Sequence, residues 1–308
     1  TVSAPAISEN VKLRQSLTVL DSMPDETLRM QQIVQSATLI AAGTSNQVAV
    51  LSDAATTLRF QSFASDTNVI LRLKDPSGTV IDAATTSTNP NVQYSSMIGG
   101  SNLVMVSCTV SNPAAGTWQA IFDGSSMTAT QTVCNLMVYG DSSVALVPQT
   151  AALSSHGADV LVTCLLTDLG LTPASPIENA VISATVQLPD GSVTNLTLCD
   201  LGATHDALPH DGVYAAVLPN AQQAGDYTVT YRATATNSMN LALQRVASGS
   251  FFVSSGHGVL LGDPVFETVD TTGDGIGDYL KVMIWVKPNV AGSYIVSGEL
   301  VNADGSKR

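Results

Sequence analysis

The chain has 308 residues, enough for two or more domains, and its 12 Lys and Arg against 25 Asp and Glu give a formal net charge of −13. A surface of that sign repels phosphate backbones and anionic lipids, which argues against a nucleic-acid partner. Charged residues are 12% of the chain and apolar residues 44%, a balance that opposes disorder and is typical of all-β extracellular proteins, and no apolar run reaches the 18 residues of a membrane span.

Residues 1–36 are predicted to be a linker that contains a short helix. In "SMPDETLRMQQIVQSA", Ser22 is a candidate N-cap, and Asp25 and Glu26 fall in the first turn. The apolar residues that follow are Leu28, Met30, Ile33 and Val34. The preceding "NVKLRQSLTVL" fits a helix or a strand. The sequence begins at Thr1, with neither an initiator Met nor a signal peptide, so we expect a processed protein or a fragment. It ends in "VNADGSKR", directly after a turn signal, which suggests that the native chain continues.

Residues 37–146 are predicted to form a β-sandwich. A "DPSG" turn (Asp75–Gly78) separates the alternating stretches "VILRL" and "TVIDA" and supplies the positive φ that a tight hairpin needs. Further on, "AGTW" (Ala115–Trp118) leads into the alternating "TWQAIF". A glycine turn that delivers an aromatic residue into a strand predicts that Trp118 points into the core.

Residues 147–255 repeat these signals and are predicted to form an immunoglobulin-like β-sandwich. "LPDG" (Leu188–Gly191) separates "ISATVQ" from "SVTNLTL", and "AGDY" (Ala224–Tyr227) leads into "DYTVTYRA". The same signal occurs a third time as "AGSY" (Ala291–Tyr294). Many short strands with turns at regular spacing indicate a series of sandwiches.

The four cysteines fall into two pairs, each within one β-rich region. Their simplest pairing is two disulfides, Cys108–Cys134 and Cys164–Cys199, and the alternative is four buried free thiols. Disulfides would place the protein in the periplasm or outside the cell.

The loop "THDALPHDG" of the second module concentrates histidines and acids. A second cation site could use Asp200, His205, Asp206 and Asp211, or zinc could bind His205, His210 and Asp200. The alternative, which we favour, is an Asx-type turn before the strand "VYAAVL".

Residues 256–308 are predicted to be a partial third β module that opens with a calcium loop. "DTTGDGIGD" places Asp270, Thr272, Asp274, Ile276 and Asp278 at positions 1, 3, 5, 7 and 9 of a calcium loop, with Gly275 at the sharp turn. Position 12 is Lys281 and a strand follows, so the loop is not an EF-hand. Glu267 or Asp263 could complete the site, and the alternative is an acidic surface turn.

Three stretches resemble known extracellular modules. "VILRLKDPSGTVID" with "VSNPAAGTWQAIF" resembles the β-sandwich that often follows a von Willebrand factor A domain or a hydrolase domain in secreted proteins. "CDLGATHDALPHDGVYAAVLP" with "AGDYTVTYRATA" resembles an immunoglobulin-like module of bacterial surface proteins, and "DTTGDGIGDYLKV" with "AGSYIVSGEL" resembles another bacterial extracellular sandwich. The resemblance covers roughly residues 45–308 and implies a secreted, periplasmic or cell-surface protein.

The sequence predicts no enzyme. It contains no G-x-S-x-G elbow, P-loop, H-E-x-x-H or dinucleotide fingerprint, and His156 and His257 have no nucleophile beside them. Trp118 and Trp285 are the only tryptophans, and both are predicted to lie in cores.

We therefore expect an all-β chain of tandem immunoglobulin-like or jelly-roll sandwiches that spaces, displays or docks a neighbouring domain of the same protein, or serves adhesion, with structural calcium. The alternatives are a module that binds a glycan or protein ligand, and the accessory region of a secreted hydrolase. No nucleic acid and no transmembrane segment are expected.

Overall fold

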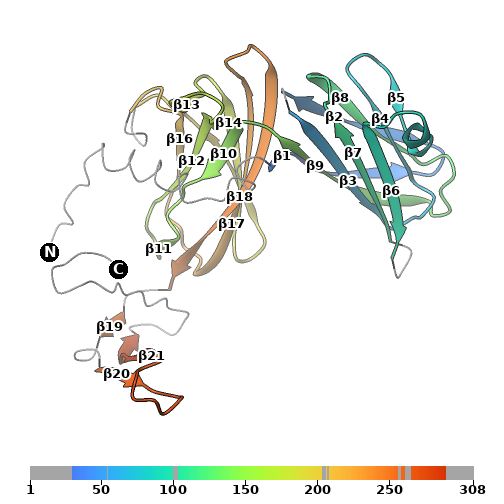
Figure 1. Ribbon diagram of the computed structural model, residues 1–308. Helices are drawn as coiled ribbons and strands as arrows, with labels where there is room; N and C mark the ends of the chain where they lie inside the picture. Colours follow the sequence, from blue (N-terminus) through green and yellow to red (C-terminus); the bar gives the residue numbers. More distant parts are fainter. Residues whose placement is uncertain are drawn as a thin grey trace.

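The structure, a computed structural model, describes residues 30–53, 55–99, 103–202, 206, 208–255, 258–260 and 265–288. Figure 1 shows that these residues form two β-sandwiches followed by short hairpins. Within those ranges the only helical element is one 3-10 turn, η1 (Ala83–Ser87). The predicted all-β class is confirmed.

The first sandwich packs a five-stranded sheet, in the order β1-β9-β3-β7-β6, against a four-stranded sheet, in the order β2-β8-β4-β5. Its strands are β1 (Met30–Ala41), β2 (Ser45–Ser52), β3 (Thr57–Ala64), β4 (Ile70–Lys74), β5 (Val80–Ile81), β6 (Val92–Ile98), β7 (Val104–Ser111), β8 (Gly116–Asp123) and β9 (Gln131–Asp141). The strict alternation along β7 and β9 buries one face of the larger sheet and leaves the other open. Trp118 lies in the core beside Phe60, with ring centroids 5.9 Å apart, as the sequence predicts.

Strand β1 replaces part of the predicted helix. Its residues pair with β9 from Met30 to Ala41, and a β-bulge lies between Gln32 and Val34. The bulge turns two adjacent residues, Ile33 and Val34, into the core, at 0% and 6% exposure. Adjacent apolar residues break the alternation of a strand and imitate helical spacing, which is why the helix prediction is wrong here. Its beginning, residues 22–29, lies outside the described residues.

The second sandwich pairs a sheet built on β12 with a five-stranded sheet in the order β11-β18-β17-β14-β15. β12 pairs with β10, β13 and β16. The strands are β10 (Val144–Pro148), β11 (Leu153–Ser155), β12 (Val160–Asp168), β13 (Ser175–Pro176), β14 (Val181–Gln187), β15 (Val193–Leu198), β16 (Val213–Leu218), β17 (Gly225–Thr236) and β18 (Ala242–Ser254). Tyr227 is buried and stacks on Phe251 at 4.8 Å, which confirms the second aromatic of the repeat as a core residue.

Both sandwiches hold the glycine of the repeat against a hairpin proline. Gly116 has φ +129°, and a Cβ there would lie 3.2 Å from two carbons of the Pro76 ring; Gly225, at φ +132°, bears the same relation to Pro189. Only glycine adopts such a φ readily. The repeated sequence signals therefore correspond to one repeated contact between a hairpin turn and the start of a core strand.

The predicted disulfide Cys108–Cys134 does not form, and both residues are buried free thiols. Strand β3 lies between them: Cys108 pairs with Phe60 on one side and Cys134 with Ala64 on the other. Two strand spacings of about 4.8 Å and four residues of about 3.3 Å each separate the two Cα atoms, well beyond the limit of about 7 Å for a disulfide.

The predicted disulfide Cys164–Cys199 is absent for a similar reason. Strand β16 separates the two residues, since Tyr214 pairs with Cys164 and Ala215 pairs with Cys199. Cys164 is buried in the core and Cys199 is exposed. The argument for an oxidising compartment therefore loses its support from the cysteines.

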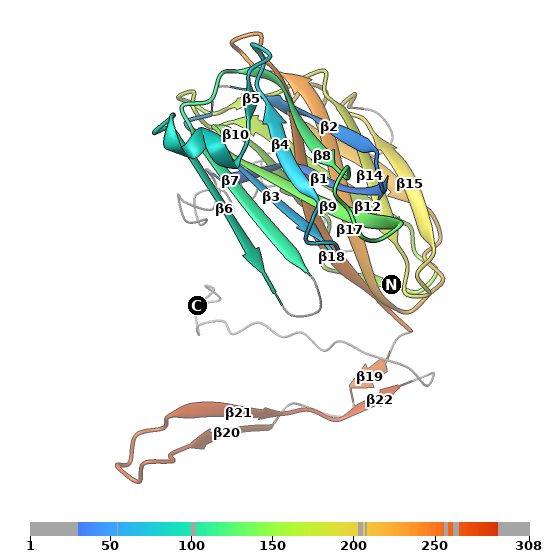
Figure 2. The ribbon, with the colours of Figure 1, turned by 90° about the vertical axis from the view of Figure 1, so that its right-hand side faces the viewer.

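Residues beyond the second sandwich form two short antiparallel pairs, β19 (Gly258–Leu260) with β22 (Val286–Pro288), and β20 (Val265–Val269) with β21 (Tyr279–Met283). Figure 2 shows that the β20–β21 hairpin extends away from both sandwiches. Trp285 is 51% exposed, so its predicted core position is wrong. The third aromatic of the repeat, Tyr294, lies outside the described residues.

Candidate metal centre in the second sandwich

Three carboxylates converge in the loop that joins β15 to β16. Ligand oxygens of Asp200, Asp206 and Asp211 all lie within 4.8 Å of one another. Across the described part of the chain, this is the one group of three acidic, histidine or cysteine side chains that meets so closely. All three were predicted from the sequence as a possible cation loop, and the structure brings them together.

The histidines of that loop do not join the group. His205 lies outside the described residues. The His210 imidazole is exposed, and its Nδ1 lies 3.7 Å from Glu178 Oε2 rather than against the three aspartates. A group made only of carboxylate oxygens fits a hard cation such as Ca²⁺ and does not fit the predicted His₂Asp zinc site.

Backbone hydrogen bonds fix the two ends of the loop. Asp200, at 6% exposure, accepts the amide protons of Asp211 at 3.3 Å and Gly212 at 3.0 Å. Gly212 has φ +80°, and a Cβ there would lie 2.8 Å from the carbonyl oxygen of Leu166. The close approach that orients Asp200 therefore requires glycine at position 212.

The predicted Asx-type turn is also present. Asp211 Oδ1 accepts the Val213 amide proton at 2.9 Å, and Asp206 Oδ2 accepts that of Gly202 at 2.9 Å. These bonds leave other carboxylate lone pairs unused. Turn and cation site are therefore compatible uses of the same side chains.

Electrostatics make the loop costly without a cation. Burial raises the pKa of Asp200 above its ordinary value, against the effect of the backbone amides that it accepts. Burial also raises the pKa of Asp211, and the neighbouring charges of Asp206 and Asp200 raise it further. Both shifts mean that the anionic forms are disfavoured, and a bound cation would reverse this.

The loop between β20 and β21 is organised differently. Asp270 accepts the amide protons of Gly273 and Gly275 at 2.6 and 2.8 Å, and these bonds lower its pKa. The Thr272 amide donates to both Asp270 and Asp278, at 3.1 and 3.2 Å, so these two carboxylates lie close together. Asp274 accepts instead from Ile276.

This second loop therefore gathers two of its three predicted carboxylates. Thr272 uses its hydroxyl on Asp270, and the Ile276 side chain is 70% exposed. Glu267 pairs with Lys281 at 3.1 Å, so that acid does not complete the group, and Asp263 lies outside the described residues. Calcium binding there stays a prediction.

A polar cluster that the sequence did not predict joins the two sandwiches. Arg245 of β18 donates through Nη2 to Asp53 Oδ2 at 2.7 Å and to Ser142 Oγ, and through Nε to the Val144 carbonyl at 2.9 Å. The side chains of Arg245 and Asp53 are 0% and 2% exposed. The available signal was a single charge, Arg245, within the otherwise uncharged "MNLALQRVASGSFFV".

Comparison with known proteins supports the fold. Residues 147–253 match the family model of the conditioned medium factor second Ig-like domain, so the second sandwich is immunoglobulin-like, as predicted. No curated protein matches the chain. Within the described residues no helix has the length and apolar character to cross a membrane.

Several solved structures are similar to parts of this chain at low identity. A Bacillus licheniformis lipase in its propeptide form is 13% identical over 73% of this chain and 42% of its own, with a TM-score of 0.43. A tandem repeat from the extending region of a large adhesion protein is 14% identical over 88% of this chain and 64% of its own, with a TM-score of 0.25. A secreted protein from Eubacterium rectale is 12% identical over 68% of each chain, with a TM-score of 0.21. This chain thus spans less than half of the lipase, and at these TM-scores none of the likenesses bears on function.

Proposed function

We propose that the chain is a non-catalytic, rigid spacer of a secreted or surface-attached protein, which holds neighbouring domains of that protein at a fixed distance and orientation. The observation that carries the proposal is the buried Arg245–Asp53 pair between the two sandwiches. A spacer needs a joint that does not bend, and a pair of this kind supplies one.

The connection between the sandwiches is too short to act as a flexible tether. Strand β9 ends at Asp141 and β10 begins at Val144, so only residues 142 and 143 lie between them. Ser142 is 3% exposed, and its hydroxyl donates to Asp53 Oδ2 at 2.7 Å. The Ser143 hydroxyl donates to Asp168 at 2.7 Å. Both linker residues are thus held by hydrogen bonds to acids.

The buried ion pair opposes bending of the joint. Bending the joint would expose Arg245 or separate it from Asp53, and an unpaired buried charge costs several kcal/mol. The contacts of Arg245 with Val144 and Gln244 carbonyls add directional bonds on the same side chain. We infer that the two sandwiches move as one body.

Calcium at Asp200, Asp206 and Asp211 supports the same role. The cation would offset two of the three negative charges and tie the β15–β16 loop to the start of β16. Its contribution is structural, since all of its candidate ligands are hard oxygens held by the fold.

Amide ¹⁵N relaxation of the intact protein tests the spacer. Amides of both sandwiches should report one rotational correlation time, that of a single body with the mass of both. A variant with a flexible Gly-Ser insertion between Ser142 and Ser143 shows what independent tumbling looks like. Two shorter correlation times in the wild-type protein would refute the rigid spacer.

A second candidate is a glycan-binding module, favoured by the polar outer face of the first sandwich.

A further inference from the structure

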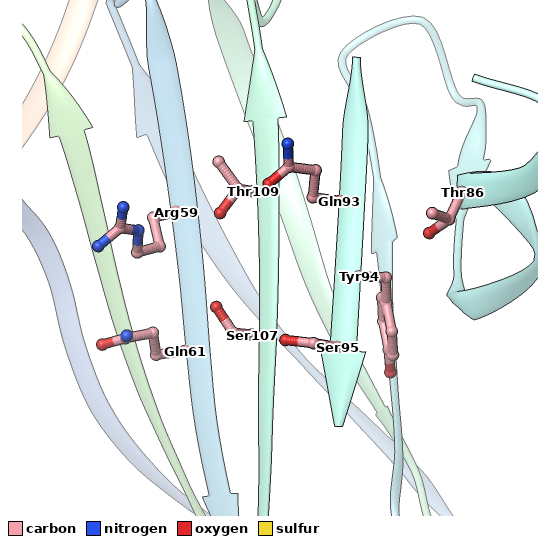
Figure 3. Close-up of a pocket in the computed structure, with 8 residues that line it drawn as sticks. All are labelled: Arg59, Gln61, Thr86, Gln93, Tyr94, Ser95, Ser107 and Thr109. Carbon is pink, nitrogen blue, oxygen red and sulfur yellow. The ribbon is translucent and has the colours of Figure 1, made fainter. Parts of the chain in front are cut away.

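The outer face of the five-stranded sheet carries two rows of polar side chains. The strand register places Gln93 of β6, Thr109 of β7 and Arg59 of β3 side by side, and the next row holds Ser95, Ser107 and Gln61. These six side chains line one cavity of about 310 Å³. Figure 3 shows them on the neighbouring strands. Thr86 of η1 and Tyr94 complete its lining. The cavity lies on the face that the second sheet of the sandwich does not cover.

These six side chains have no partners within the described structure. None makes a side-chain hydrogen bond to another described residue, and Arg59 forms no ion pair with one. By contrast, Arg72 pairs with Asp123 at 2.8 Å and Arg245 with Asp53 at 2.7 Å. None of the residues that line the cavity is acidic, although the chain has 25 acidic residues. The unpaired guanidinium of Arg59 is therefore a local site for an anion.

The chemistry of the rows favours a sugar over a protein. The core of a protein interface is rich in large apolar and aromatic side chains. Here the rows offer hydroxyls and amides, which both donate and accept and so match sugar hydroxyls. On the other side of Arg59, Tyr139 of β9 is its cross-strand partner and adds an aromatic ring to the same face.

We propose that this face binds an acidic polysaccharide, with a uronate carboxylate on Arg59 and sugar hydroxyls on Gln61, Gln93, Ser95, Ser107 and Thr109. A guanidinium fork matches a carboxylate in two parallel hydrogen bonds. The net charge of −13 does not prevent this contact, since charges more than about 8–10 Å away are screened at physiological salt. The inference deepens the glycan-binding candidate and is independent of the rigid spacer.

Affinity electrophoresis of the full chain tests the proposal. The probes are polygalacturonate, an acidic polysaccharide, and dextran, a neutral one. Wild-type protein should be retarded by polygalacturonate and not by dextran. Arg59→Gln should bind polygalacturonate about ten- to a hundred-fold more weakly, as expected for a lost charged hydrogen bond, and Arg59→Lys should fall between the two. Lys74→Gln is the matched control, because it removes one positive charge from β4 of the other sheet and should bind like wild type.

Three results would overturn the proposal: no retardation of the wild-type protein, equal retardation of Arg59→Gln, or retardation by dextran. The last would indicate a neutral-glycan face. An unchanged melting temperature for Arg59→Gln confirms that any loss reflects binding. A negative result leaves the relaxation test of the spacer untouched.

Discussion

Trp118 is the largest fully buried side chain among the described residues. Its indole Nε1 also donates to the Ala114 carbonyl at 2.9 Å, so the ring is fixed by packing and by a hydrogen bond. Trp118→Ala should lower the free energy of unfolding by about 3–5 kcal/mol, the range for large aromatic truncations in cores. Urea unfolding followed by circular dichroism measures it. Trp285→Ala is the control, since that ring is half exposed and its loss should cost much less. A Trp118→Ala loss no larger than that of Trp285→Ala would contradict the assignment of Trp118 to the core.

The cysteines should differ in reactivity. Burial raises the pKa of Cys108 to about 12 and that of Cys134 to about 11, and it also raises the pKa of Cys164. Thiolate is the reactive form, so all three should resist alkylation at pH 8, whereas Cys199 is exposed. Mass spectrometry after native labelling should find one adduct per chain, on Cys199, and four after unfolding. An unreduced peptide linking Cys164 to Cys199 would restore the original disulfide prediction.

For single residues, the sequence predicted burial correctly where burial depends on neighbouring residues in the chain. Trp118 and Tyr227 follow a glycine turn and alternate with polar neighbours, so their direction can be read from a few residues. The cysteine pairs could not be judged in this way, because β3 and β16 lie between the partners and strand order depends on distant residues. The core position predicted for Trp285 was wrong because an apolar stretch of sequence does not show whether another element packs over it.

Among the elements, the acidic loop between β15 and β16 has the sharpest consequences. Burial raises the pKa of Asp200 and of Asp211, and the charge of Asp206 raises both further, so the folded chain bears some of this repulsion at neutral pH. Asp206→Asn keeps an oxygen for the Gly202 amide and removes the charge. In chelator at pH 7 the variant should melt about 2–4 °C above wild type.

The pH dependence has a definite sign. Because the folded-state pKa values of Asp200 and Asp211 are raised, their carboxylates reduce stability above those values and cease to do so once protonated. The advantage of Asp206→Asn should therefore shrink as the pH falls through the raised pKa values towards the ordinary carboxyl range. Calorimetric melting at several pH values measures it, and an advantage that grows on acidification would contradict the repulsion.

Calcium should stabilise the folded wild-type protein, because it offsets the repulsion among the three carboxylates. With a dissociation constant of about 10⁻⁴–10⁻³ M, a few millimolar calcium should stabilise the wild type by about 1–2 kcal/mol, and Asp206→Asn should lose this gain. Asp274→Ala probes the β20–β21 loop in the same titration. If calcium stabilises Asp206→Asn as much as wild type but does not stabilise Asp274→Ala, the cation binds the β20–β21 loop and not the β15–β16 loop.

The acidic loops and the predicted helix differ in how far local sequence determines them. Spacing identified both acidic loops, because glycines and aspartates are visible as letters. Spacing could not tell that Asp200, Asp206 and Asp211 meet, since this depends on the two bridges that close their loop, Cys199 with Ala215 and Leu201 with Pro209. The helix predicted across Met30 failed for a related reason, as a single bulge displaced the alternation.

For the whole molecule, the decisive feature is the joint between the sandwiches. Arg245→Met should lower the free energy of unfolding by about 3–5 kcal/mol, because it leaves Asp53 buried without a counter-charge. Arg72→Met breaks the more exposed pair with Asp123 and should cost about 0–1 kcal/mol. Replacing Arg245 and Asp53 together by apolar residues should recover much of the loss. If the double variant is as unstable as the sum of the single ones, the pair is not what holds the joint.

The joint also constrains how the protein can be made. Arg245 lies 103 residues after Ser142, so a ribosome adding about 5–20 residues per second finishes the first sandwich about 5–20 s before the arginine appears. Throughout that interval Asp53 and Ser142 lack the arginine that they contact in the folded protein. A chaperone could bind the first sandwich at this uncovered site. When translation is arrested before residue 245, the first sandwich should be sensitive to protease, whereas arrest well beyond that residue should make it resistant.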